Sequence, residues 1–257
     1  ISALNTLKDG PAAIDFIDST LIQALGTINP AIVKPLEGGE PAVLFFIEID
    51  DEAQRTRKKI EKKITKILNN AGGEIIFPQE SEREQWERLR DGASFYLAHS
   101  DGKKRAVPVL DDGQIPIDRV TEYFKELDGL MKAAGIEQFA AWGQAGTGLI
   151  SVAPLFDLSS VGDRQKIFKM MEAYYGYICS IGGSISGEYA EGRMRGLFNT
   201  RQFNESEMDV FKRIKRIFDP LLIYNPGVKL DVKVEELKAS IRSEYTLDHQ
   251  YNHLPRG

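Results

Sequence analysis

The 257-residue chain has little of the chemistry that several protein classes need. It contains one cysteine, Cys179, so it forms no internal disulfide and suits a reducing compartment. Its net charge of −5 gives no overall electrostatic case for nucleic-acid binding. No apolar run approaches the ~20 residues of a membrane span, and the first residues lack the pattern of a signal peptide. We therefore expect a cytoplasmic protein with no membrane span and no nucleic-acid partner.

Histidine is also scarce, and the catalytic templates built on it are missing. His249 and His253 have H-x-x-x-H spacing, but they lie in a polar tail without the glutamate of an H-E-x-x-H zinc site, and His99 stands alone. No G-x-S-x-G nucleophile elbow occurs. Cys179 ends an apolar helical pattern and is expected to be a small core residue rather than a nucleophile. We expect no metal site.

What is present is an alternation of helix and strand patterns. The apolar spacing predicts helices over residues 12–25, 51–73, 80–95, 117–134, 163–180 and 204–220. It predicts a buried strand at 41–50, short strands at 73–77 and 104–110, and two strands within 138–154. Because that last pair is joined too tightly for a crossover helix, the sheet is expected to be antiparallel. The order predicts an α+β fold: a ferredoxin-like antiparallel sheet with helices mainly on one face, plus a C-terminal helical segment.

The expected helix over residues 51–73 is basic. It carries seven Lys and Arg residues against three acidic ones, beside an apolar stripe of Ile60, Ile64, Ile67 and Leu68. Such a face is either a solvated helix exterior or a surface for an anionic partner. The residues alone leave both readings open.

The stretch SIGGSISGEYAEGRMRG, residues 180–196, concentrates five glycines in a loop. Gly182 and Gly187 have the spacing of a phosphate-binding loop, but Glu188 stands where that loop needs lysine and would repel a phosphate. The glycines allow tight turns, or close approach of the backbone to something flat. The stretch is therefore either a structural turn or a ligand-facing loop that presents polar groups such as Tyr189 and Arg193.

A second candidate lies in the charged segment over residues 80–95. Arg88 and Arg90 follow Trp86, and guanidinium groups bind carboxylates with two parallel hydrogen bonds. A solvated helix face is the alternative account of the same residues.

Four segments resemble one family in order and spacing. GGSISGEYAEGRMR is similar to the GGSISGEHGIGRLK-type motif of FAD-linked oxidases, the vanillyl-alcohol-oxidase-like flavoproteins that include D-lactate dehydrogenase and the catalytic subunit of glycolate oxidase. KDGPAAIDFIDSTLI, AWGQAGTGLISVAP and FDPLLIYNPGVKL resemble further elements of the same family. The resemblance covers roughly residues 10–230.

The resemblance implies a C-terminal cap domain over residues 1–230, followed by a polar tail over 231–257. In the family this domain covers the flavin ring and forms the substrate pocket, while FAD is held mainly by an N-terminal domain that we expect to be absent from this chain. By position, the expected cofactor contacts are Gly183, Ser184, Gly187, Glu188 and Asn225. The expected catalytic pair is Glu188 and Tyr189, and the expected substrate contacts are Arg88, Arg90, Gln144, Ser151 and Arg193.

The departures from the family pattern concern its histidines. Tyr189 stands where the family has the histidine after Glu188, and a phenol, with an ordinary pKa of ~10, is a poor base near neutrality. Gln144 and Ser151 stand where metal-dependent members carry two more histidines. The usual W-x-x-R pattern would put arginine at Leu89, which Arg88 and Arg90 flank.

The resemblance predicts the cap of an FAD-dependent oxidoreductase that oxidises a 2-hydroxy acid, inactive without its FAD domain. An electron-transfer subunit is a further expected partner, and attachment to the inner face of the membrane is the alternative to a free cytoplasmic location. The rival hypothesis is a non-catalytic partner or docking module of a flavoprotein complex, which the lost histidine positions favour.

Overall fold

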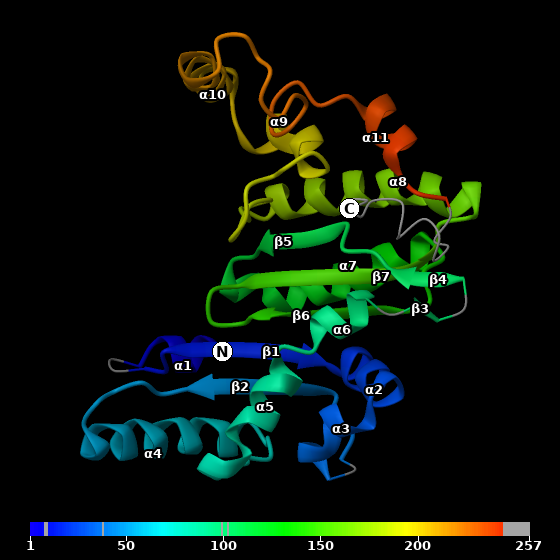
Figure 1. Ribbon diagram of the computed structural model, residues 1–257. Coiled ribbons are helices and arrows are strands. Elements are labelled where there is room, and N and C mark those ends of the chain that lie inside the picture. Colours follow the sequence, from blue (N-terminus) through cyan, green and yellow to red (C-terminus); the bar gives the residue numbers. More distant parts are fainter. Residues whose placement is uncertain (8–9, 38, 99, 102, 244–257) are drawn as a thin grey trace, which may run out of the picture.

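One antiparallel sheet organises the chain in the computed structural model, which describes residues 1–7, 10–37, 39–98, 100–101 and 103–243 (Figure 1). The strands are β1 (Ala13–Asp18), β2 (Val43–Glu48), β3 (Ser100–Asp101), β4 (Lys104–Ala106), β5 (Leu110–Gln114), β6 (Phe139–Gln144) and β7 (Leu149–Asp157). Their order is β2-β1-β6-β7-β4-β3, and β5 pairs with the first part of β7. The predictions for His99, His249 and His253 fall outside the described residues.

Helices pack on both faces of the sheet, with the longer ones on one face. The helices are α1 (Ser2–Asn5), α2 (Ser19–Ile28), α3 (Pro30–Val33), α4 (Gln54–Asn70), α5 (Arg83–Arg90), α6 (Ala93–Ala98), α7 (Val120–Ala133), α8 (Val161–Ser180), α9 (Asn199–Gln202), α10 (Glu205–Phe218) and α11 (Val234–Ser240). The larger core joins the sheet to α4, α7 and α8, and the smaller core joins it to α2, α3, α5 and α6. The predicted α+β class with an antiparallel sheet is confirmed.

The two cores follow from strand alternation. Along β1, Ile14 and Phe16 enter the larger core while Ile17 enters the smaller one, because successive side chains point to opposite faces. In the larger core the hydroxyl groups of Tyr123 and Tyr174 lie 2.8 Å apart and satisfy each other.

The helix predicted over residues 12–25 is wrong in its first half. Residues 13–18 form the strand β1, which pairs with both β2 and β6, and the helix begins only at Ser19. The Asp18 carboxylate marks the change, since it accepts a hydrogen bond of 2.8 Å from the Leu21 amide as the N-cap of α2. The apolar residues of β1 have a spacing that also fits one face of a helix. The segment is a strand because its backbone pairs with a neighbouring strand on each side.

Two strand predictions also need correction. Residues 73–77 lie outside any strand, and Ile76 and Phe77 are exposed. The strand at 41–50 exists as β2, but it is an edge strand with half-exposed side chains rather than a buried one. Cys179, predicted as a core residue, is half-buried and packs against the larger core.

The C-terminal helical segment is present and projects from the rest of the fold (Figure 1). Asn204 caps α10 by accepting a hydrogen bond from the Glu207 amide, as expected for an Asn-x-x-Glu capping box. The described part of the tail predicted over residues 231–257 is not polar throughout, because it contains α11 and the side chain of Leu237 is buried. Across the described ranges, we find no helix with the length and apolarity of a membrane span.

Candidate functional site

The glycine loop, defined here as residues 181–194, runs from the end of α8 along the edge of β5. Gln114 and Ser184 exchange two backbone hydrogen bonds of 2.9 Å, and the Gly187 amide donates to the Asp112 carbonyl at 3.0 Å. The loop therefore extends the sheet by a short irregular stretch. Its position is set by the protein's own strand.

Two glycines are required by this close approach. A Cβ atom on Gly183 would lie 2.5 Å from the carbonyl oxygen of Gln114, and one on Gly187 would collide with the Leu149 side chain. Both were expected to contact a cofactor. Their contacts here are with β5 and β7, so the structural account of these glycines stands on geometry within this chain.

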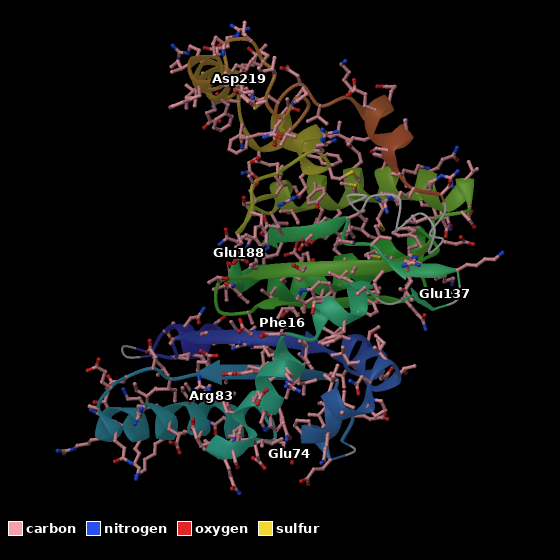
Figure 2. The ribbon with its side chains drawn as sticks, viewed as in Figure 1. Phe16, Glu74, Arg83, Glu137, Glu188 and Asp219 are labelled. Carbon is pink, nitrogen blue, oxygen red and sulfur yellow. The ribbon has the colours of Figure 1, made fainter. Side chains whose placement is uncertain are left out.

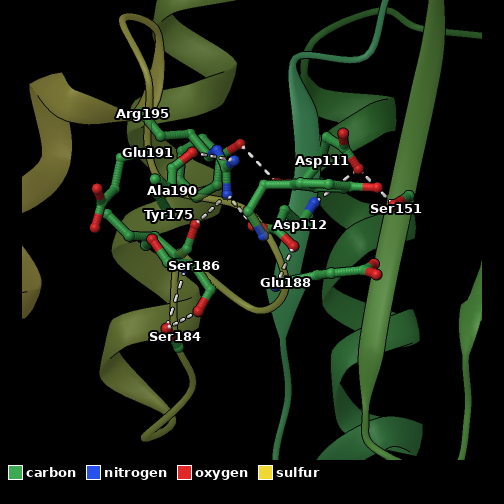
Figure 3. Close-up of polar contacts among 12 residues, drawn as sticks. Asp111, Asp112, Ser151, Tyr175, Ser184, Ser186, Glu188, Ala190, Glu191 and Arg195 are labelled. Atoms are coloured by element: carbon green, nitrogen blue, oxygen red, sulfur yellow. Dashed lines mark hydrogen bonds and ion pairs between the residues drawn. The ribbon is translucent and has the colours of Figure 1, made fainter. Parts of the chain in front are cut away.

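Asp112 is the residue that fixes the loop. Its side chain is buried, and one carboxylate oxygen accepts the Glu188 amide at 2.6 Å while the other accepts the Tyr189 amide at 2.9 Å (Figure 3). The Arg195 guanidinium pairs with the same carboxylate at 2.5 Å. It also donates to the carbonyls of Ile185 and Ala190, so one ion pair closes the loop from both ends.

Sequence reasoning missed Asp112. The only signal is an Asp-Asp-Gly run inside an apolar strand pattern, which is typical of a turn. In the structure Asp112 has a positive φ of 61°, an uncommon conformation outside glycine. That backbone turn directs its carboxylate at the loop.

Clamping the backbone leaves the side chains of Glu188 and Tyr189 free. Both are exposed, Tyr189 to 63%. Figure 3 shows the Glu188 carboxylate on the same side of β5 as Asp111 and Ser151. The Ser184 hydroxyl is instead used internally, because it donates to the Ser186 carbonyl at 2.9 Å.

The Glu188 side borders a polar part of the sheet. The register pairs Asp15 with Gln144 and Trp142 with Ser151, so alternation puts these four side chains on one face. The Ser151 hydroxyl donates to the Asp111 carboxylate. Gln144 and Ser151, both predicted as substrate contacts, therefore lie on the same face.

The polar face is defined by Asp15, Trp142, Gln144 and Ser151, and two of these residues, Asp15 and Gln144, line a hollow at the start of β1. The hollow has a volume of about 310 Å³, and Asp15, Gln144 and Thr147 line it. Burial raises the pKa of Asp15, while the positive charge of Arg90 acts in the opposite direction. A partly buried carboxyl group beside an amide can bind the hydroxyl groups of a small polar molecule.

The three arginines predicted as substrate contacts lie in different environments. Arg90 is half-buried and binds Glu48 at 2.5 Å and Asp91 at 2.9 Å, close enough to Asp15 to affect its pKa. Arg88 points into solvent and pairs with Glu84 along α5, as the solvated-face alternative predicted. Arg193 is exposed on the glycine loop.

A second buried ion pair joins the glycine loop to the exit segment, defined here as residues 217–230. The buried Glu191 carboxylate binds the Lys229 ammonium at 2.5 Å, and the Lys229 amide donates to the Gly192 carbonyl at 2.7 Å. Burial raises the pKa of Glu191, but the hydrogen bonds to its carboxylate, led by the one from Lys229, and the Lys229 charge together outweigh burial, so the pKa is lowered. Asn225 lies in this exit segment and is exposed, with a positive φ of 46°.

The described residues do not by themselves form a binding site for the pyrophosphate of FAD. The amides of Glu188 and Tyr189 already bind Asp112, so they are not available to a pyrophosphate. Gly183 and Gly187 pack on the protein's own strands. Exposed side chains on the loop and the polar face remain to contact a flavin ring. Among the described residues, no group of three or more His, Cys, Asp or Glu is placed to hold a metal ion.

Comparison with known proteins agrees with this geometry. Residues 2–228 match the family of FAD linked oxidases, C-terminal domain, and the chain belongs to that family. The chain is similar to a D-lactate dehydrogenase of Archaeoglobus fulgidus, at 24% identity over 217 residues that cover 84% of the chain and 45% of that protein. It is also similar to the glycolate oxidase subunit GlcD of Bacillus subtilis, at 22% identity over 88% of the chain and 47% of that protein.

A solved structure shows the same fold. The 4-ethylphenol oxidase from Gulosibacter chungangensis superposes with a TM-score of 0.56 and 14% identity, over 87% of this chain and 48% of that one. The resemblance found in the four sequence segments is thus confirmed at the level of family and fold. The chain spans about half the length of these relatives.

Proposed function

We propose that this chain is the substrate-binding cap domain of an FAD-dependent oxidoreductase that oxidises a 2-hydroxy acid. The observation that carries the proposal is the clamped loop, which presents Glu188 and Tyr189 beside the polar face. Relatives named for lactate, glycolate and 2-hydroxyglutarate support the substrate class. We also propose a cytoplasmic location, because a chain with one cysteine has no internal disulfide that would need an oxidising compartment.

The chain's own residues would position the substrate and handle its proton. When bound, FAD supplies the hydride acceptor for oxidation of the alcohol carbon. The Glu188 carboxylate accepts the hydrogen bond of the substrate hydroxyl and takes its proton at a carboxylate oxygen. Tyr189 donates a hydrogen bond from its phenol, and Gln144 and Ser151 bind the remaining polar groups of the substrate.

An N-terminal FAD-binding domain is the partner that this cap requires. The exit segment supports its docking, because five side chains there are strongly exposed although they are apolar or aromatic: Ile217, Phe218, Leu221, Ile223 and Tyr224. Contiguous apolar surface of this kind is typical of an interface between domains or proteins. The other end of the exit segment contacts the glycine loop through Lys229, so the same segment connects this exposed surface to the loop.

The test is flavin reduction in the flavin-loaded enzyme that contains this chain. D-lactate, glycolate and D-2-hydroxyglutarate are mixed anaerobically with the enzyme, and bleaching of the flavin absorbance is followed. Glu188→Gln should slow reduction by roughly 100-fold or more, the usual contribution of a general base. Glu126→Gln, an exposed glutamate on α7, is the matched control and should not change the rate.

Two results would contradict parts of the proposal. Unchanged reduction in Glu188→Gln would remove Glu188 from proton transfer, and unchanged reduction in Tyr189→Phe would remove Tyr189. If the flavin-loaded protein is reduced by none of the three hydroxy acids, the non-catalytic alternative is favoured. That alternative rests on Gln144, Ser151 and Tyr189 at the family's histidine positions, and it assigns the chain to docking within a flavoprotein complex that includes an electron-transfer subunit.

A further inference from the structure

The outer surface of α4 has a charge pattern that the cap function does not use. Five basic residues recur at helical spacing along it: Arg55, Lys58, Lys59, Lys62 and Lys66. These five, called the basic stripe from here on, are all exposed. We propose that the basic stripe, together with the neighbouring Phe77 and Ile76, is a docking surface for an anionic membrane.

The stripe faces away from the protein. Residues 55, 58, 59, 62 and 66 follow the i, i+3, i+4, i+7, i+11 pattern of one helix face, and the buried residues Ile60 and Ile64 lie on the opposite face. The only acidic residue of α4, Glu61, lies between these two faces. The positive charges are therefore collected on the solvent side over about 16 Å of helix.

These charges are not neutralised within the chain. None of the five side chains forms an ion pair with another described residue. The protein as a whole carries a net charge of −5, so the stripe is a local reversal of the overall sign. A negatively charged partner surface is attracted to such a stripe, and each Lys or Arg near an anionic bilayer strengthens binding about fivefold.

Exposed apolar side chains beside the stripe favour a lipid surface over an acidic protein. Phe77 is 60% exposed and Ile76 is 49% exposed. Phe77 lines an open groove of about 470 Å³ with Lys62, Lys66, Asn70 and one acidic residue, Glu61. An aromatic side chain next to lysines can enter the headgroup region while the ammonium groups bind lipid phosphates. The apolar face of α4 itself stays in the protein core.

The position of α4 leaves the candidate site accessible. Figure 1 shows α4 beside β2 at one end of the molecule, with α10 at the opposite end. Figure 2 shows Glu74 and Arg83 at the same end as α4, with Glu188 and Asp219 far from it. A membrane bound along α4 would therefore leave the glycine loop and the exit segment free. The inference does not depend on the proposed oxidation.

The experiment is cosedimentation of the 257-residue chain with lipid vesicles. Vesicles of phosphatidylcholine with about 30% phosphatidylserine should retain the chain, and vesicles of phosphatidylcholine alone should not. Raising the salt to about 0.5 M should release it, because screening weakens charge attraction between exposed groups. The triple variant Lys58→Gln, Lys62→Gln, Lys66→Gln should bind on the order of tenfold less, or weaker still.

Matched variants separate the stripe from a general charge effect. Lys103→Gln, Lys125→Gln, Lys169→Gln removes the same charge from exposed lysines elsewhere and should bind like the wild type. Phe77→Ser should weaken binding, whereas Phe95→Ser, at another exposed phenylalanine, should not. Circular dichroism confirms that each variant is folded.

Four outcomes would overturn the inference. The first is no retention of the wild type by anionic vesicles, and the second is equal retention by neutral ones. The third is equal loss of binding in the two lysine triple variants. Binding to soluble polyglutamate without binding to anionic vesicles would also overturn it, and would assign the stripe to an acidic protein.

Discussion

The glycine loop and the exit segment meet at Glu191 and Lys229, but they differ in how far their side chains are packed within the chain. The loop has its backbone bound by β5, by Asp112 and by Arg195, and its Glu191 carboxylate is buried and paired with Lys229. The exit segment has an ordered backbone too, since Asp219 accepts the amides of Ile223 and Tyr224 at 3.0 Å. Its apolar side chains, however, are left in solvent, with Phe218 81% exposed and Leu221 77% exposed.

The difference separates what this chain supplies from what it needs. Contacts within the chain are sufficient to hold the loop, so they alone position the backbone of Glu188 and Tyr189. Exposed apolar side chains on an ordered backbone gain free energy only when another surface covers them. The site is therefore preorganised on one side, and the proposed function assigns its other side to a partner domain.

The largest effect on stability is expected at Asp112. Replacing it with alanine leaves the Arg195 guanidinium buried without a counter-charge and removes the acceptor of two loop amides. Breaking a buried pair in this way costs about 3–5 kcal/mol of unfolding free energy. Urea unfolding measures it, and a loss below about 1 kcal/mol would show that Asp112 does not hold the loop.

A smaller effect is expected at Gly183. Alanine there brings a Cβ atom against the Gln114 carbonyl, and neither backbone segment can move without breaking their paired hydrogen bonds. We expect about 1–3 kcal/mol of destabilisation by chemical denaturation. Gly129→Ala is the control, because no atom lies within 4 Å of a Cβ there in α7, and alanine should stabilise that helix slightly. Equal stability of the two variants would contradict the close approach.

The junction between loop and exit segment should depend on pH. The pKa of Glu191 is lowered in the folded protein by Lys229, so the pair stabilises the fold above the ordinary pKa of glutamate, about 4.3. That stability is lost as pH falls through the lowered pKa. Glu191→Gln should cost about 1–2 kcal/mol at pH 7, and this cost should shrink progressively as the pH is lowered below the ordinary pKa of glutamate. A cost that does not change with pH would exclude the ion pair as its source.

The smallest effect on stability is expected in the exit segment. Phe218→Ser and Leu221→Ser remove exposed side chains and should change the unfolding free energy by at most about 0.5 kcal/mol. The same pair should weaken association with the FAD-binding domain tenfold or more, measured by calorimetry, if these side chains are interface anchors. A large loss of stability with unchanged association would reverse the comparison between loop and exit segment.

The sequence predicted the longer elements and the family, because these rest on local spacing and on motifs. The helix predicted over residues 204–220 is found as α10, which begins with a capping box of Asn204 and Glu207. The prediction for residues 13–18 was wrong because the apolar residues of a short segment fit both a helical and a strand period. Pairing with β2 and β6, which lie elsewhere in the chain, makes the segment a strand.

The site was predicted only in part for a related reason. Glu188, Tyr189, Gln144 and Ser151 are recognised from motifs, and the register brings the last two onto one face. Asp112 lies more than 70 residues from the amides that it binds. No neighbouring residue in the sequence indicates that contact, since an Asp-Asp-Gly run is typical of an ordinary turn.

The measurement that tests the central claim most directly is the visible spectrum of the 257-residue chain after incubation with FAD and removal of the excess. A colourless protein is predicted, because the loop amides are occupied by Asp112 and the chain supplies only a cover for the flavin. A yellow protein that retains flavin in near-equal amount would contradict the account, and would show that these residues form a complete flavin site by themselves.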